Sequence, residues 1–151
     1  MIKYLYLFIA FILELIVLNY LNSSYLYPMF TVVSVAMFYN LFKVKKEYNI
    51  AVTILSLLYG LLFLNNVFLG FLIFFVIKEF IFFVYKNFNI NLFKVLILCV
   101  MCIVINDVIL YLFLLMPFAF VHLAYKVLNS LIINILFMLF LYPLISFSSK
   151  F

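Results

Sequence analysis

Six ionisable side chains lie inside stretches of this 151-residue chain that are otherwise almost entirely apolar. They are Glu14, Lys78, Glu79, Asp107, His122 and Lys126. A charge at the centre of a lipid bilayer costs roughly 2.5–3.5 kcal/mol on insertion scales, so such residues usually face inward and find partners. Two roles fit them: proton relays and transporters move ions through intramembrane carboxylates, and buried ion pairs fix the contacts between helices.

The ionisable residues of the chain do not favour an intramembrane protease. These enzymes use paired aspartates, a serine–histidine pair or an HExxH motif, whereas this chain contains one Asp and one His. Its two glycines are Gly60 and Gly70, and Pro28, Pro117 and Pro143 lie near the ends of apolar runs. The broken midplane helices of coupled transporters are therefore not expected. We predict no catalytic residues and no enzymatic activity.

The two cysteines, Cys99 and Cys102, form a CxxC pair, a spacing that can indicate redox chemistry or a metal site. The pair lies deep in an apolar run, without a second CxxC or a nearby histidine. Burial in hydrocarbon makes a thiol inert. We interpret both cysteines as small core residues and predict neither a metal nor a cofactor.

The composition places the whole chain in a membrane. Hydrophobic residues make up 73% and charged residues 9% of the sequence, whereas soluble domains carry roughly 25% charged residues. The net charge of +5 comes from lysines at the ends of apolar runs rather than on one basic face, so nucleic-acid binding is not expected. The abundance of Lys, Asn, Ile and Phe is typical of an AT-rich genome, which favours a bacterial source.

Apolar runs predict the elements that must position these charges, because a helix needs about 20 residues to cross a bilayer. Six candidate spans form a single all-α domain over 1–151, at 4–21, 27–42, 50–64, 67–85, 93–115 and 118–146. The last run is long for one crossing, so 118–128 could instead lie at the membrane interface. We therefore expect an integral membrane bundle of five to six transmembrane helices.

The lysines predict the orientation of the bundle, because cytoplasmic loops carry an excess of basic residues. With the N-terminus inside, the inner connections and termini receive Lys3, Lys43, Lys45, Lys46, Lys86, Lys94 and Lys150. The outer connections 22–26, 65–66 and 116–117 contain no lysine. Both termini are predicted to be cytoplasmic, in the cytoplasmic (inner) membrane of a bacterium.

The last two runs form a predicted hairpin that turns near 116–117. Asp107 and Lys126 lie equally far from this turn along the chain, so antiparallel helices bring them to the same depth. His122 and Tyr111 match in the same way. We expect an Asp107–Lys126 ion pair that holds the hairpin or docks it to a partner. The alternative is that Lys126 extends to the outer interface and Asp107 meets water or another helix.

Further polar residues are predicted to border this pair. Asn106 precedes Asp107, and Asn129 shares a helical face with Lys126. In the fourth run, Lys78 is expected to extend towards the cytoplasm or to meet Glu14 at a similar depth. Glu79 points about 100° away from Lys78 on an ideal helix, so one neighbour should not satisfy both. With two glycines in the chain, small-residue association of the GxxxG type is not expected.

Several short motifs follow one another in an order that resembles the rod shape-determining protein MreD family, over roughly 27–147. They are YPMF with Pro28, a short lysine-bearing inner loop, YGLLFLNNVFLG (59–70), INDVILY with Asp107, and LNSLIINILFMLFLYPL with Asn134. In the turn between the third and fourth runs, Gly60 and Gly70 match the family pattern. The family's acidic position there is vacant, and Asn65 and Asn66 are the nearest polar residues.

The resemblance implies a non-enzymatic scaffold for cell-shape determination and lateral peptidoglycan synthesis. Its partner would be a bitopic MreC-like protein, and through it an MreB-like filament and a glycosyltransferase–transpeptidase pair. The family's fold is similar to substrate-binding subunits of energy-coupling-factor transporters. The alternative is therefore a vitamin-binding subunit, with an outward pocket lined by His122, Lys126, Tyr111 and Asn66. A small membrane protein with neither role is a third interpretation.

Overall fold

The computed structural model describes residues 2–21, 27–42, 44–88, 92–113 and 120–148. Side chains are described at these positions except 2, 21, 92, 120–123 and 144–148. The described residues form α-helices, one 3-10 helix and short connections, without a strand. In chain order the helices are α1 (Ile2–Leu21), α2 (Phe30–Met37), the 3-10 helix η1 (Phe38–Leu41), α3 (Lys45–Leu62), α4 (Val67–Asn87), α5 (Leu92–Phe113) and α6 (Phe120–Ser148).

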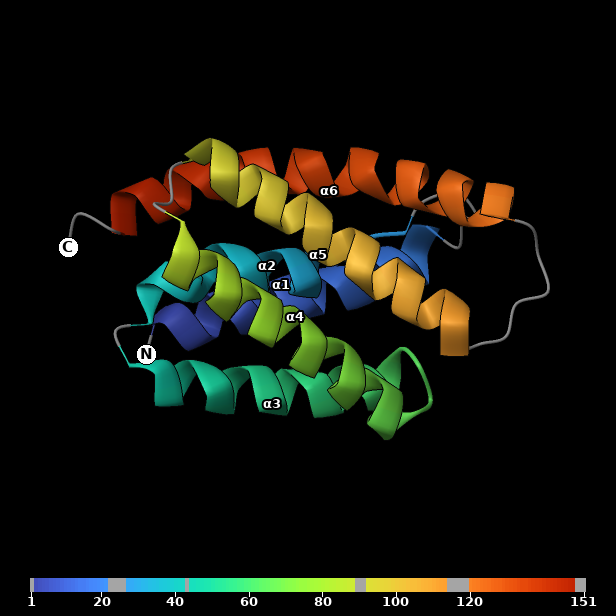
Figure 1. The fold of residues 1–151 in the computed structure, drawn as a ribbon, viewed down its shortest axis with the longest axis horizontal. Coiled ribbons are helices and arrows are strands. Elements are labelled where there is room, and N and C mark those ends of the chain that lie inside the picture. The colour runs from blue at the N-terminus through green and yellow to red at the C-terminus, as the bar shows by residue number, and fades with distance from the viewer. Residues whose placement is uncertain (1, 22–26, 43, 89–91, 114–119, 149–151) are drawn as a thin grey trace.

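The long helices run antiparallel to their chain neighbours in an elongated bundle (Figure 1). Four of them are long and apolar enough to cross a membrane: α1, α4, α5 and α6. This confirms the prediction of an all-α bundle suited to a lipid bilayer. In α3, the first turn carries Lys45, Lys46 and Glu47, so its apolar part begins only after that turn.

The expected second span, 27–42, differs from a crossing helix. Residues 27–29 are not helical, and α2 with η1 contains only 12 residues, Phe30–Leu41. At about 1.5–2 Å per residue this pair extends roughly 20 Å, less than the roughly 30 Å of a bilayer core. Every residue of α2 is buried. A helix that is apolar on all sides is stable only inside a bundle, and α2 is the central helix of this one.

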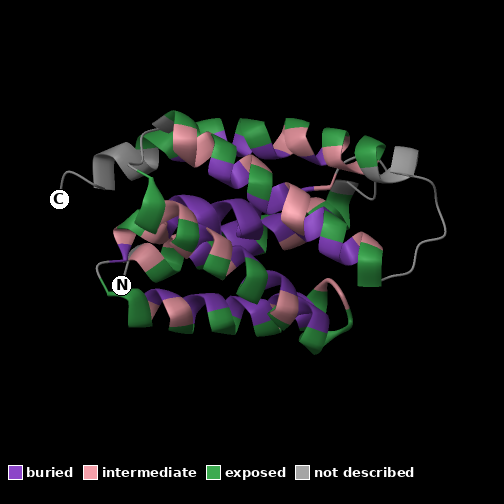
Figure 2. Ribbon diagram, in the orientation of Figure 1, coloured by how far each residue is buried: buried purple, intermediate pink, exposed green. Residues whose placement is uncertain are grey.

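The surroundings of α2 explain its composition. It packs against α1, α4, α5 and α6, and it appears as a fully buried element in the middle of the molecule (Figure 2). Phe30 stacks on Phe137 of α6 with ring centroids 4.1 Å apart. Cys99 and Cys102 of α5 are fully buried free thiols, and Cys99 Sγ lies 3.9 Å from the Val33 carbonyl oxygen. Both cysteines are core residues, as the sequence predicts.

The hairpin of α3 and α4 corrects the expectation that small residues do not mediate helix contacts. A Cβ atom added at Gly70 would lie 2.5 Å from the Gly60 Cα and 2.7 Å from the Ser56 carbonyl oxygen. One added at Gly60 would lie 2.8 Å from the Val67 Cα. Ser56 and Gly60 are four residues apart on α3, so they form a small-xxx-small face against Gly70. Few small residues suffice because they lie opposite one another.

The last helix, α6, runs without a break from Phe120 to Ser148. Residues 120–128 are therefore continuous with the following span rather than a separate helix, and 118–119 lie outside the described residues. Pro143 lies inside α6, five residues before its end.

Candidate functional site

The beginning of α2 lies inside the bundle, which creates an unusual demand for hydrogen bonds. The first N–H groups of any helix have no partner within that helix, and in a membrane interior water cannot supply one. Glu14 on α1 meets this demand at Thr31, whose backbone N–H donates to Glu14 Oε2 at 2.7 Å. Glu14 is completely buried. A carboxylate at this position also interacts favourably with the positive end of the helix dipole.

Asn134 on α6 holds the non-helical segment that leads into α2. Its Oδ1 accepts from the Met29 backbone N–H at 2.8 Å. Its Nδ2 donates to the carbonyl oxygens of Tyr27 at 3.2 Å and of Ser130 at 2.6 Å. One buried amide therefore ties two positions of the 27–29 segment to α6. The motif resemblance singled out Asn134, but its hydrogen-bond partners could not be read from the sequence.

Asp107 and Lys126 form the ion pair that the hairpin register predicts. Lys126 Nζ lies 3.6 Å from Asp107 Oδ1, a contact longer than a hydrogen bond. The Asp107 side chain is fully buried, whereas the Lys126 side chain is 32% exposed. The Ser130 hydroxyl lies 3.4 Å from Asp107 Oδ2, and the Lys126 ammonium lies 5.0 Å from the centroid of the Tyr27 ring. The pair therefore connects α5, α6 and the segment before α2.

Two polar residues in this region escaped the sequence analysis. Ser130 is four residues after Lys126, a spacing that places both on one face of α6 and could have been noticed. Tyr59 of α3 is buried in the neighbourhood of Glu14 and Asp107. No sequence spacing links α3 to α1 and α5, so only the fold brings Tyr59 to these carboxylates.

The other predicted neighbours of the ion pair have different positions. Asn106 is buried, and its Nδ2 lies 3.3 Å from Met29 Sδ, so it faces the entry of α2. Tyr111 and Asn129 are half-buried. His122 belongs to α6, but its side chain lies outside the described residues. We call the residues around the start of α2 the entry cluster; it comprises Glu14, Tyr59, Asn106, Asp107, Lys126, Ser130 and Asn134.

Lys78 lies outside the entry cluster, and its expected meeting with Glu14 is wrong. Its Nζ lies 3.3 Å from Glu79 Oε1 and 4.8 Å from the centroid of the Phe75 ring. Glu14 instead binds the backbone of Thr31. Lys78 and Glu79 pair with each other rather than sharing a third residue. Both side chains are long and flexible enough to meet although their Cα–Cβ bonds diverge.

The turn before α4 is built by its two asparagines. Asn65 has a left-handed backbone with φ 50°, which asparagine tolerates better than most residues. Asn66 is the N-cap of α4, and its Oδ1 accepts from the Leu69 backbone N–H at 3.1 Å. The Asn66 N–H in turn donates to the Gly60 carbonyl oxygen at 2.9 Å. Turn and cap geometry thus accounts for all four predicted turn residues, including Gly70.

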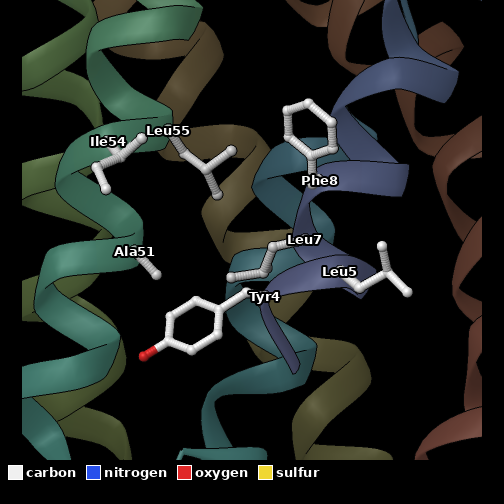
Figure 3. A pocket seen from close by; sticks show the side chains of 7 residues that line it. All are labelled: Tyr4, Leu5, Leu7, Phe8, Ala51, Ile54 and Leu55. Carbon is white, nitrogen blue, oxygen red and sulfur yellow. The ribbon is translucent and has the colours of Figure 1, made fainter. Parts of the chain in front are cut away.

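Two cavities lie elsewhere on the described part of the bundle. The first, of about 420 Å³, is an apolar groove between α1 and α3 (Figure 3); its lining residues are Tyr4, Leu5, Leu7, Phe8, Ala51, Ile54 and Leu55. The second, of about 510 Å³, lies where α3 begins and α4 ends. Neither is lined by Lys126, Tyr111 or Asn66, the described residues of the vitamin pocket considered above.

Basic residues gather at one end of the bundle. There α1 begins, α3 begins, α4 ends and α5 begins (Figure 1), which places Lys3, Lys45, Lys46, Lys86 and Lys94 together. Lys3 pairs with Glu47, and the Lys45 ammonium lies 3.9 Å from the centroid of the Phe82 ring. Lys43 and Lys150 lie outside the described residues. We call this the basic end.

Comparison of the chain with protein-family models, curated proteins and solved structures finds no match. The described residues also contain no group of three or more His, Cys, Asp or Glu side chains that could hold a metal ion. The entry cluster is therefore interpreted from its own geometry. Its polar groups bind the backbone that leads into α2, or one another, and this arrangement can hold a short helix in the centre of a membrane bundle.

Proposed function

We propose that this chain is a non-enzymatic scaffold in the cytoplasmic membrane of a bacterium, belonging to the machinery that determines rod shape. The observation that carries the proposal is the use of the buried polar groups. Glu14 and Asn134 bind the backbone at the entry of α2, and Asp107 pairs with Lys126. These contacts fix helices relative to one another, as a static assembly module requires.

The order of motifs supports the more specific assignment to the MreD family. Asp107 and Asn134, which carry part of that resemblance, both belong to the entry cluster. In this proposal the chain passes through the membrane six times, with both termini in the cytoplasm. The second passage is made by α2 and η1 together with the non-helical residues 27–29 that precede them. The fold would then be similar to that of energy-coupling-factor substrate-binding subunits, without their ligand.

The partner in this proposal is a bitopic MreC-like protein, which connects the chain to an MreB-like filament and to the glycosyltransferase–transpeptidase pair of lateral peptidoglycan synthesis. A bitopic protein offers a single transmembrane helix. Exposed apolar side chains on the outer faces of the long helices suit contact with such a helix or with lipid; examples are Phe8, Ile54, Phe83 and Phe140.

Depletion of the protein in its native cell, followed by microscopy, tests the proposal. We expect rods to become round, and a plasmid copy of the gene to restore their shape. The MreC-like protein should co-purify with the restored chain. Cells that keep their shape but acquire a vitamin requirement would contradict the scaffold and support the substrate-binding subunit.

A further inference from the structure

The cavity at the basic end has a mixed lining of ammonium, hydroxyl and aromatic groups. It lies between η1, the first turn of α3 and the last turns of α4. The lining residues are Tyr39, Lys45, Glu79, Phe82, Phe83, Tyr85 and Lys86. None of them belongs to the entry cluster. The function proposed above does not use this cavity.

Positive charge in this cavity is not balanced by the described residues. Lys45 contacts the face of the Phe82 ring, and no carboxylate among the described residues pairs with Lys45 or Lys86. Glu79, the one acidic residue of the lining, already pairs with Lys78 at 3.3 Å. The cavity therefore presents two ammonium groups that can accept an anion.

Two further polar features lie beside the cavity: the Tyr85 side chain and the start of α3. The Tyr85 hydroxyl is buried and makes no hydrogen bond with any described residue. The N-cap of α3 is Val44, which supplies no side-chain hydrogen bond to the helix. The positive end of the α3 dipole at this first turn favours a negatively charged oxygen.

The location of the cavity at the basic end favours a lipid headgroup as the anion. The basic end of the bundle is where its long apolar helices terminate, at the level expected for lipid headgroups. The tyrosines of the lining, Tyr39 and Tyr85, are typical of this boundary. Basic pockets between transmembrane helices bind anionic lipid headgroups. A phosphate there would meet the Lys45 and Lys86 ammonium groups, while the acyl chains would remain against the apolar helices.

We propose that this cavity binds the phosphate of an anionic phospholipid, held by Lys45 and Lys86. Such a lipid would connect α3 to α4 at the end opposite the Gly60–Gly70 contact. It would also fill a gap between two helices that the side chains leave open. The site is independent of the scaffold function and can be tested on the isolated protein.

Native mass spectrometry of the delipidated protein in detergent measures the binding directly. Phosphatidylglycerol and phosphatidylcholine with identical acyl chains serve as probes. We expect phosphatidylglycerol to bind more tightly, and the Lys45→Gln/Lys86→Gln variant to lose about five-fold in affinity for each lysine removed. Lys46→Gln is the matched control, because Lys46 is exposed beside Lys45 but does not line the cavity.

Three results would overturn the proposal. The first is equal binding of the two lipids. The second is an unchanged affinity in the double variant, or a loss equally large in Lys46→Gln, which would indicate general attraction to a basic surface. The third is displacement of phosphatidylglycerol by inorganic phosphate at equal concentration, which would assign the site to a soluble anion. Unchanged thermal unfolding of the variants without lipid would show that they are folded.

Discussion

The two buried carboxylates, Asp107 and Glu14, each bind a group on another helix. Asp107 is fully buried and has Lys126 as its counter-ion, while Glu14 is fully buried and binds a backbone N–H of α2. Both lie in the entry cluster, although they are far apart in the sequence. Glu14 thereby connects α1 to the start of α2, and Asp107 connects α5 to α6.

A double-mutant cycle at Asp107 and Lys126 tests the ion pair. Lys126→Met should lower the free energy of unfolding in detergent by about 1–3 kcal/mol, because it leaves a buried carboxylate without a counter-ion. Asp107→Asn combined with Lys126→Met should recover much of that loss, because no buried charge then remains. Strictly additive losses would mean that the two side chains do not interact.

At the scale of elements, α2 distinguishes this bundle from a simple set of crossing helices. It is too short to cross a bilayer and is buried on every side. The backbone hydrogen bonds of the non-helical residues 27–29 before it must be satisfied inside the protein, because unpaired backbone groups are costly in lipid. Asn134 does this for Met29 and Tyr27. The hairpin of α3 and α4, in contrast, depends on close contact between Gly60 and Gly70.

Replacing Asn134 by Leu should release the segment that leads into α2. The change removes the acceptor of the Met29 N–H and the donor to the Tyr27 carbonyl. We expect faster hydrogen exchange over 29–33 and a loss of about 2 kcal/mol or more in stability, because buried backbone groups lose their partners.

Asn129→Leu on the same helix is the control for this change, because Asn129 is half-buried and makes no described contact with residues 27–31. It should leave exchange over 29–33 unchanged. Equal exchange over that segment in the two variants would contradict the conclusion that Asn134 holds the segment before α2.

In the molecule as a whole, lysines gather at one end of the bundle, and this grouping predicts how the bundle is oriented in the membrane. Five described lysines lie where helices α1, α3 and α5 begin and α4 ends. The turn at Asn65 and Asn66 lies at the other end of the α3–α4 hairpin. Because basic residues are retained on the cytoplasmic side, this separation predicts which end faces the cytoplasm.

Single-cysteine labelling in cells tests that orientation. In a background with Cys99→Ala and Cys102→Ala, cysteines at Lys46 and Asn87 should react only after the membrane is permeabilised. A cysteine at Asn66 should react in intact cells with a reagent that cannot cross the membrane. Labelling of positions 46 and 87 from opposite sides would contradict the bundle itself. Labelling of both from outside would reverse its orientation.

The sequence alone determined the membrane class of the protein, the approximate helix ranges and the register that pairs Asp107 with Lys126. Apolar length and the geometry of one hairpin are properties of contiguous residues, so they can be read along the chain. Only the tertiary structure decided that α2 is a short central helix, that Glu14 binds Thr31 rather than Lys78, and that Tyr59 joins the carboxylates. These features depend on which helices surround a given face, and contacts between distant segments leave no local periodicity.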